Sequence, residues 1–246
     1  MRVTMSQDTL IELTDVAVYQ PDDEFSRFRY DNSTQVLSEV NMSVGDGEMV
    51  YFIGKVGSGK SSLLKLLYAE LPMVEGEARV LGFDLAKLRR RDIPQLRRRM
   101  GIVFQDYQLL CDRSVYENLR FVMRATGWKD EVKIRARVEE LLGIVGLEGR
   151  GDKMPFELSG GEQQRLVIAR ALINDPRVIL ADEPTGNLDP KSADDIMKLF
   201  RSIVERGCSV IMATHNVQLI SRYPARTYVF RKGRMTSVAS DKLSGL

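Results

Sequence analysis

No apolar run in the 246-residue sequence approaches the roughly 20 residues that a helix needs to cross a bilayer. The opening residues, MRVTMSQDTLIELTD, are also too polar and acidic for a secretory signal peptide. We therefore expect a soluble chain, whose role at any membrane would come through a partner protein.

Cysteine and excess charge are scarce as well. Only Cys111 and Cys208 are present, far apart and without CxxC spacing, which is typical of reduced thiols in a cytosolic protein. The 36 basic and 34 acidic residues leave a net charge of +2, so no strong global field favours nucleic acid. Hydrophobic residues make up 43% of the chain, which is enough for a substantial core.

The sequence does contain short apolar runs typical of buried parallel strands, namely EMVYFIG (48–54), VILAD (178–182) and SVIMATH (209–215). Between the last two, residues 192–207 have apolar side chains at helical spacing, and Gly207 is placed to end the helix. Strand, helix and strand in this order predict an α/β fold.

Other segments are less regular. Residues 8–20, DTLIELTDVAVYQ, predict an opening strand, and the polar residues 21–35 predict a loop or long hairpin without indicating a function. Residues 107–156 show helical spacing at Val138, Leu141, Leu142 and Val145 and no convincing strand. We expect a helical insert within a single domain that spans residues 1–246.

One segment matches a known phosphate-binding pattern. GKVGSGKS (54–61) fits G-x-x-x-x-G-K-[ST] at every required position, after an apolar strand and before an amphipathic helix. Its glycines allow successive N–H groups to point inward at phosphate oxygens. Lys60 is expected to reach the β- and γ-phosphates, and the Ser61 hydroxyl to ligate Mg²⁺. The loop alone predicts only nucleoside triphosphate binding, which kinases and GTPases share.

Two carboxylates end the apolar strand in RVILADEP (177–184). Asp182 fits the aspartate on the Mg²⁺ side of such a site. Glu183 is a candidate general base that polarises the attacking water. The alternative is a pair of solvated residues at a strand end.

A further segment, ELSGGEQQR (157–165), places a serine and two glycines at a polar helix start. Amides at a helix N-terminus form an anion site, but the phosphate loop lies far upstream. The phosphate loop, LSGGEQQR and ILADEPTGNLD, in this order, closely resemble the nucleotide-binding subunits of ABC transporters. In that family two cassettes pair head to tail, so the signature of one copy would face the γ-phosphate held by the other.

This resemblance covers about residues 10–235 and implies a P-loop NTPase fold of the ABC type. Its parts would be a RecA-like core, an antiparallel β subdomain and a helical subdomain at about residues 107–160. It also implies ATP hydrolysis, ATP and Mg²⁺ as cofactors, and an ATP-dependent homodimer.

The resemblance assigns roles residue by residue. The catalytic residues would be Glu183, His215 and Gln105, and the metal ligands Ser61, Gln105 and Asp182. The nucleotide-binding residues would be Tyr19, Gly54, Lys55, Val56, Gly57, Ser58, Gly59, Lys60, Ser61 and Ser62. The signature facing the partner's nucleotide would be Ser159, Gly160, Gly161 and Glu162, and the loop coupling the two sites Asn187, Leu188 and Asp189. Among these, Tyr19 would stack on adenine and His215 would contact the γ-phosphate.

Two positions depart from the family pattern. Val56 stands where serine is frequent, and Asn216 follows His215 where an acidic residue is frequent. Neither change removes a catalytic group, so we expect competent hydrolysis. Soluble ABC ATPases of DNA repair would need a long heptad insertion, and those of translation two cassettes in one chain; neither is present. A non-hydrolysing scaffold is a third class, against which intact Glu183 and His215 argue.

Within the family, residues 95–119 and 212–222 are most similar to the cell-division ATPases, while lipoprotein-releasing (LolD-like) and MacB-type export ATPases share most motifs. The resemblance implies an integral membrane partner, no nucleic acid, and a peripheral location at the cytoplasmic face of the inner (plasma) membrane.

The candidate docking residues follow Gln105 and are Tyr107, Leu109, Leu110, Val115 and Tyr116, with burial in the helical insert as the alternative. The arginines of LRRRDIPQLRRR (88–99) predict a solvated face or, if functional, contact with anionic lipid.

Overall fold

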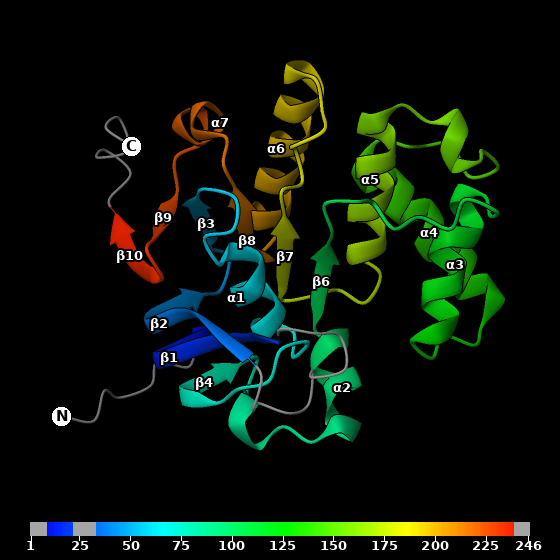
Figure 1. The fold of residues 1–246 in the computed structure, drawn as a ribbon. Coiled ribbons are helices and arrows are strands. Elements are labelled where there is room, and N and C mark those ends of the chain that lie inside the picture. Colours follow the sequence, from blue (N-terminus) through cyan, green and yellow to red (C-terminus); the bar gives the residue numbers. More distant parts are fainter. Residues whose placement is uncertain (1–8, 22–32, 239–246) are drawn as a thin grey trace.

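The computed structural model describes residues 9–21 and 33–238, which form two sheets and the helices around them (Figure 1). The central sheet has the order β10 (Arg234–Val238), β9 (Arg226–Arg231), β3 (Met49–Gly54), β8 (Ser209–Thr214), β7 (Val178–Asp182) and β6 (Met100–Val103). Its strands run parallel except for β10, which pairs antiparallel with β9. The strands predicted at 48–54, 178–182 and 209–215 are therefore confirmed.

The second sheet is antiparallel and has the order β2 (Ser33–Gly45), β1 (Thr9–Pro21), β4 (Glu75–Val80) and β5 (Phe83–Asp84). Strand β1 confirms the predicted opening strand. Of the two alternatives predicted for residues 21–35, a loop or a long hairpin, the structure supports the hairpin, because Pro21 of β1 pairs antiparallel with Ser33 of β2 and the ladder continues through Gln35. The remainder of that segment, residues 22–32, lies outside the described residues.

Helices α1 and α6 cover opposite faces of the central sheet. The helices of the described residues are α1 (Lys60–Leu67), α2 (Ile93–Arg98), α3 (Val115–Ala125), α4 (Glu131–Val145), α5 (Gly160–Ala171), α6 (Pro190–Glu205) and α7 (Val217–Arg222). Short 3₁₀ turns occur at η3 (Leu85–Lys87), η4 (Arg90–Asp92) and η5 (Pro155–Glu157). No helix within residues 9–21 and 33–238 combines the length and apolar character of a membrane span.

Strand β3 shows why the central strands are apolar throughout. Tyr51 and Ile53 point into the core that contains α5 and α6, whereas Val50 and Phe52 point into the core shared by α1 and the antiparallel sheet. A strand covered on both faces gains from burying every side chain, so the alternation of polar and apolar residues is lost.

Helix α6 follows from its sequence. The carboxylate of Asp189 accepts hydrogen bonds from the N–H groups of Lys191 and Ser192, each at 3.0 Å, and thereby caps the helix. The apolar residues at helical spacing face the core, and Phe200 is fully buried. Beyond the last turn Gly207 adopts φ +92°, a left-handed conformation that ends the helix. The predicted helix is confirmed, and it begins and ends two residues before the expected range of 192–207.

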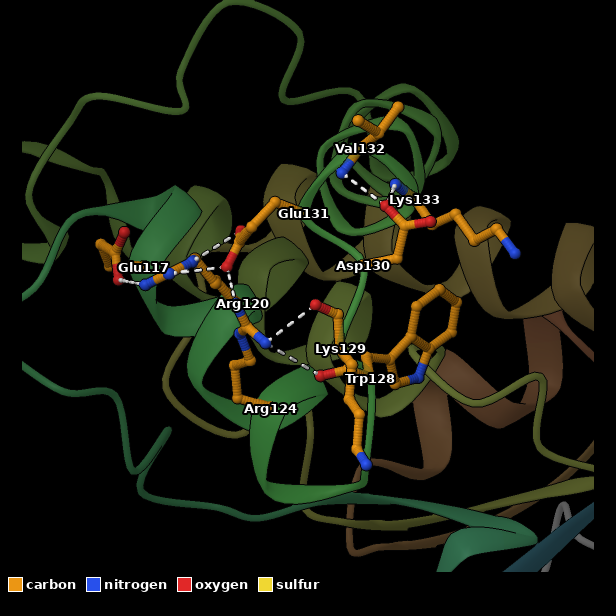
Figure 2. Close-up of polar contacts among 9 residues, drawn as sticks. All are labelled: Glu117, Arg120, Arg124, Trp128, Lys129, Asp130, Glu131, Val132 and Lys133. Atoms are coloured by element: carbon orange, nitrogen blue, oxygen red, sulfur yellow. Dashed lines mark hydrogen bonds and ion pairs between the residues drawn. The ribbon is translucent and has the colours of Figure 1, made fainter.

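Helices α3, α4 and α5 pack together beyond the edge strand β6 (Figure 1). Figure 2 shows the polar network that closes the α3–α4 connection, in which Arg120 and Arg124 both reach the carboxylate of Glu131. Arg124 also donates to the carbonyl of Lys129 at 3.0 Å, and Asp130 caps α4 through Val132 N at 2.9 Å. Residues 107–156 contain helices and no strand, as predicted; the subdomain boundaries stay a prediction.

The arginines of residues 88–99 are all exposed. Two of them hold neighbouring loops, since Arg97 donates to the Tyr68 carbonyl at 2.9 Å and Arg99 to the Leu81 carbonyl at 3.2 Å. The exposure agrees with a solvated face, and contact with anionic lipid stays a prediction.

Candidate nucleotide-binding site

The predicted site residues follow the carboxyl ends of neighbouring parallel strands. The phosphate loop follows β3, the carboxylates Asp182 and Glu183 end β7, and His215 follows β8. Strand β8 pairs in parallel with both β3 and β7, so all three ends meet at one edge of the sheet. Ligands of open α/β sheets bind at this edge.

The phosphate loop is curled around the amine of Lys60. Lys60 Nζ donates to the carbonyls of Gly54 at 2.8 Å and Lys55 at 3.3 Å, and its side chain is only 6% exposed. Gly59 caps α1 with φ +101°, and a Cβ at this position would lie 2.9 Å from Leu37 Cδ2. Glycine is required here by both the left-handed backbone and the close approach of β2.

Asp182 ends β7 and lines one cavity together with Ser61, at the start of α1. Burial raises the pKa of Asp182 above its ordinary value, and the neighbouring Ser61 hydroxyl opposes that shift. The Oδ1 atom is buried and has no hydrogen-bond partner. A buried carboxylate oxygen without a partner, beside a hydroxyl, is the set of hard oxygen donors that suits Mg²⁺.

A cavity of about 140 Å³ adjoins this carboxylate and is lined by Ser61, Asp182 and Gln108, among others. Gln105, the predicted metal ligand, is exposed, and Gln108 shares the cavity with Ser61 and Asp182. The role of Gln105 at the metal stays a prediction.

Glu183 is held between two of the other predicted residues. Its Oε1 lies 3.8 Å from Lys60 Nζ, and its Oε2 lies 3.0 Å from His215 Nδ1. The Glu183 side chain is 10% exposed and its backbone has φ +47°, a strained conformation for a residue other than glycine. Strain of this kind persists where surrounding contacts enforce it, and it is concentrated at functional sites.

Tyr19 lies at the end of β1, half-buried beside β4. Its hydroxyl donates to Glu75 Oε1 at 2.6 Å, and this hydrogen bond raises the pKa of Tyr19. The neighbouring Gln20 accepts from the Ser62 hydroxyl at 3.3 Å, which ties β1 to the start of α1. The sequence contains no signal for Glu75, because its contact with Tyr19 depends on the pairing of β1 with β4.

The signature lies at the start of α5, apart from α1 (Figure 1). Ser159 caps the helix by accepting from Glu162 N at 3.3 Å, and Glu162 Oε2 accepts from Ser159 N at 2.9 Å and from the Ser159 hydroxyl at 2.8 Å. This is a complete capping box. Its hydrogen bonds from Ser159 lower the pKa of Glu162.

The predicted coupling loop precedes α6. Asp189 caps that helix, Leu188 packs against the core, and Asn187 is exposed. Leu188 also lies near the signature, since its Cδ2 is 3.6 Å from the position that a Cβ on Gly160 would take.

The candidate docking residues divide into two groups. The prediction is wrong for Val115, which is fully buried in the core because it begins the inward face of α3. Leu110 is partly buried, and the partly buried residues that pack against that core are Tyr107, Leu109 and Tyr116.

Comparison with known proteins agrees with this geometry. The family described as ABC transporter matches residues 37–186. Among solved structures, cbiO1 from Clostridium perfringens, part of the ABC transporter complex cbiONQ, superposes with a TM-score of 0.83 at 30% identity. That match covers 96% of this chain and 90% of the other. The ATP-binding cassette MJ0796, in a dimeric post-hydrolysis state bound to ADP and Pi, has a TM-score of 0.80 at 29% identity, covering 96% and 100%.

The chain belongs to the ABC transporter family and is an ATP-hydrolysing cassette of it, which confirms the predicted fold class and activity. Curated relatives place it more narrowly, since several similar proteins carry the name Cell division ATP-binding protein FtsE. The relative from Streptococcus pneumoniae is 45% identical, covering 84% of this chain and 90% of its own length. The relative from Mycobacterium tuberculosis is 44% identical over 81% and 86%, and that from Escherichia coli K12 is 42% identical over 84% and 92%.

Proposed function

We propose that this chain is the FtsE-like ATPase of a cell-division complex and acts with an FtsX-like integral membrane protein. ATP-driven closure of two copies would be transmitted through that protein to control cell-wall hydrolases. The observation that carries the proposal is identity of 42–45% to FtsE proteins over most of both chains. In this role the chain lies at the cytoplasmic face of the inner membrane, held there by its partner.

The residues at the carboxyl ends of β3, β7 and β8 support a separate chemical role for each. Lys60 neutralises charge on the β- and γ-phosphates, for which its amine must leave the carbonyls that it now contacts. Ser61 and Asp182 hold Mg²⁺, which supplies further charge neutralisation when bound. Glu183 orients and polarises the attacking water, and His215 contacts the γ-phosphate and holds the Glu183 carboxylate in place.

The signature belongs to the site of a second copy. Ser159, Gly160 and the helix start behind them offer hydroxyl and N–H donors to the γ-phosphate held by the partner copy. Asn187, Leu188 and Asp189 couple the two sites. Hydrolysis removes the anion between the copies and releases the dimer.

The Glu183→Gln variant tests this arrangement, since it should bind ATP without hydrolysing it. We expect size-exclusion chromatography with saturating MgATP to show a dimer, and ADP to leave the variant monomeric. A variant that stays monomeric with MgATP would contradict the shared site.

We further propose that the partner docks beside Leu109, Leu110 and Tyr116. These side chains are only partly buried; Leu109 and Leu110 precede α3, and Tyr116 lies in its first turn. Charged substitutions at both Leu109 and Tyr116 should abolish co-purification of the membrane partner while sparing ATP binding. Co-purification that survives the double substitution would rule out this surface.

The identity of the partner is open to a direct experiment. The Glu183→Gln protein with MgATP is used to capture partners from detergent-solubilised membranes, and the captured proteins are identified by mass spectrometry. Recovery of an FtsX-like four-helix protein supports the division role. Recovery of a lipoprotein-releasing or MacB-type permease would keep the ATPase roles and replace division by envelope transport.

A further inference from the structure

The loop after Gln105 contains an unusual turn. Tyr107 and Gln108 are consecutive and both left-handed, with φ +56° and +49°. Residues other than glycine rarely adopt this conformation, because the side chain crowds the backbone. Two such residues in succession need outside contacts to hold them.

Arg170 supplies those contacts. Its guanidinium donates from Nη2 to the Tyr107 carbonyl at 2.7 Å and from Nη1 to the Gln108 carbonyl at 2.5 Å. Burial lowers the pKa of Arg170, while the charge of Asp106 opposes that shift, and a guanidinium stays protonated regardless. A planar fork that meets two successive carbonyls fixes both the position and the direction of the turn.

The held turn places the Tyr107 ring among segments distant in sequence. The Tyr107 hydroxyl lies 3.5 Å from the position that a Cβ on Gly160 would take, and Leu188 Cδ2 lies 3.6 Å from the same position. Tyr107 and Leu188 both pack against the core that includes α5. Arg170 and Gly160 both belong to α5, so this helix meets the turn twice, near its start through Gly160 and near its end through Arg170.

We propose that Tyr107 and Arg170 form a junction that moves the loop after Gln105, the signature and the 187–189 loop as one unit. Both are positioning residues, because neither is placed to touch nucleotide or reacting atoms. The inference rests on the proposed function, in which these three loops must reach two nucleotides at the same time. With the junction intact, docking of one loop aligns the other two; without it, each loop must be ordered separately when the dimer closes.

The test uses the Glu183→Gln protein as the parent, so that closure is measured without hydrolysis. Two quantities are determined for each variant: ATP affinity of the monomer at low protein concentration, and the ATP concentration that gives half-maximal dimer. Arg170→Lys keeps the charge but cannot reproduce two parallel N–H donors. Tyr107→Asn keeps a residue that tolerates the left-handed backbone but removes the ring.

Both variants should leave monomer affinity unchanged and raise the ATP concentration for half-maximal dimer on the order of tenfold, a common size for coupling between sites. Tyr107→Phe keeps the ring against the core and loses only the hydroxyl beside Gly160, so it should raise the ATP concentration for half-maximal dimer less than Tyr107→Asn does. The double variant should lose less than the product of the two single effects, because the two residues act through one turn.

Arg124→Lys is the matched control. Arg124 also donates to two backbone carbonyls, those of Trp128 and Lys129, and lies at the α3–α4 connection (Figure 2). It should lower thermal stability without shifting dimer formation. Two results would overturn the junction and leave the proposed function standing. One is an equal rise in the ATP concentration for half-maximal dimer in the Arg124→Lys control. The other is half-maximal dimer formation by Arg170→Lys and Tyr107→Asn at the same ATP concentration as the parent. A parent that never dimerises would overturn the junction together with the proposed function.

Discussion

Two helix starts in this molecule carry glycine-containing turns, and they are built in opposite ways. At α1, Gly59 is the N-cap and no side chain accepts from the first N–H groups. At α5, Ser159 caps the helix and Glu162 completes the capping box. The first helix start is left open by its own chain, whereas the second is already satisfied.

The surroundings of the two helix starts differ in the same direction. Beside α1, Lys60 and Asp182 are largely buried, and Asp182 Oδ1 has no hydrogen-bond partner among residues 9–21 and 33–238. Beside α5, Ser159 and Gly160 are exposed and the carboxylate of Glu162 occupies the capping position. In the proposed function, the open start of α1 receives nucleotide within one chain, whereas the signature needs an anion strong enough to compete with Glu162. A γ-phosphate carried by a second copy meets that requirement.

Lys60→Ala tests the uncapped start of α1 and should have the largest effect on ATP affinity. Removing a charge-assisted contact to two phosphates should weaken ATP binding by the single chain roughly a hundredfold. Isothermal titration measures this directly. Lys198→Ala, at a lysine that pairs with Asp194 on the surface of α6, is the control and should bind ATP as the wild type does. Unchanged ATP affinity in Lys60→Ala would contradict the assigned role.

Asp182→Asn also tests the start of α1, because it separates the contribution of Mg²⁺ to ATP affinity from the contribution of the nucleotide itself. The variant should lose the gain in ATP affinity that Mg²⁺ provides, about tenfold, and keep its metal-free affinity. Titrations with and without Mg²⁺ measure both. A variant with a full Mg²⁺ response would show that Asp182 does not hold the metal.

The same substitution has a consequence for stability. Because burial raises the folded-state pKa of Asp182, ionisation of this carboxyl costs stability as the pH rises through that pKa. Asn at this position has no such cost. Without metal and at neutral pH, Asp182→Asn should therefore unfold at a temperature no lower than the wild type, and the gap should shrink as the pH falls.

Ser159→Ala tests the satisfied side against a matched control, Ser114→Ala. Each serine caps a helix by accepting from the N–H three residues on, at 3.3 Å in both cases, so each loss should cost about 1 kcal/mol of stability. Only Ser159→Ala should raise the ATP concentration needed for dimer formation, by about tenfold for one charge-assisted hydrogen bond. Equal dimer formation by both variants in the Glu183→Gln background would remove Ser159 from the partner's site.

The two sides also differ in what the sequence revealed. The central strands and helix α6 are predictable because each is a continuous apolar run, as in β3, or has clear helical spacing, as in α6. Strand β4, EGEARV, was missed because it buries only Ala78 and Val80 and exposes charged residues between and before them. Strand β6 was missed because it has only four residues, Met100–Val103, and follows a run of arginines.

Within the site, motif residues were identified because their chemistry requires a fixed local spacing. Contacts between distant segments left no such pattern. Glu75 reaches Tyr19 only through sheet pairing, and Arg170 reaches Tyr107 and Gln108 only because α5 packs beside their loop. Val115 is different, because its burial does have a local signal: Val115, Leu119 and Met123 recur at i, i+4 and i+8, and this apolar stripe is the face that α3 buries.

Glu131→Gln should have the smallest effect. Glu131 begins α4, which packs beside α5, and it lies at neither of the two compared helix starts. Arg120, and then Arg124, hold the pKa of Glu131 at about 2, below its ordinary value of 4.5 (Figure 2). The network thus stabilises the folded chain at neutral pH and loses that contribution as the pH falls from about 4.5 to about 2. The variant should unfold slightly earlier than the wild type at pH 7, and chemical denaturation at stepwise lower pH should show the gap closing. ATP affinity and dimer formation should not change; a shift in either would mean that the α3–α4 connection takes part in closure.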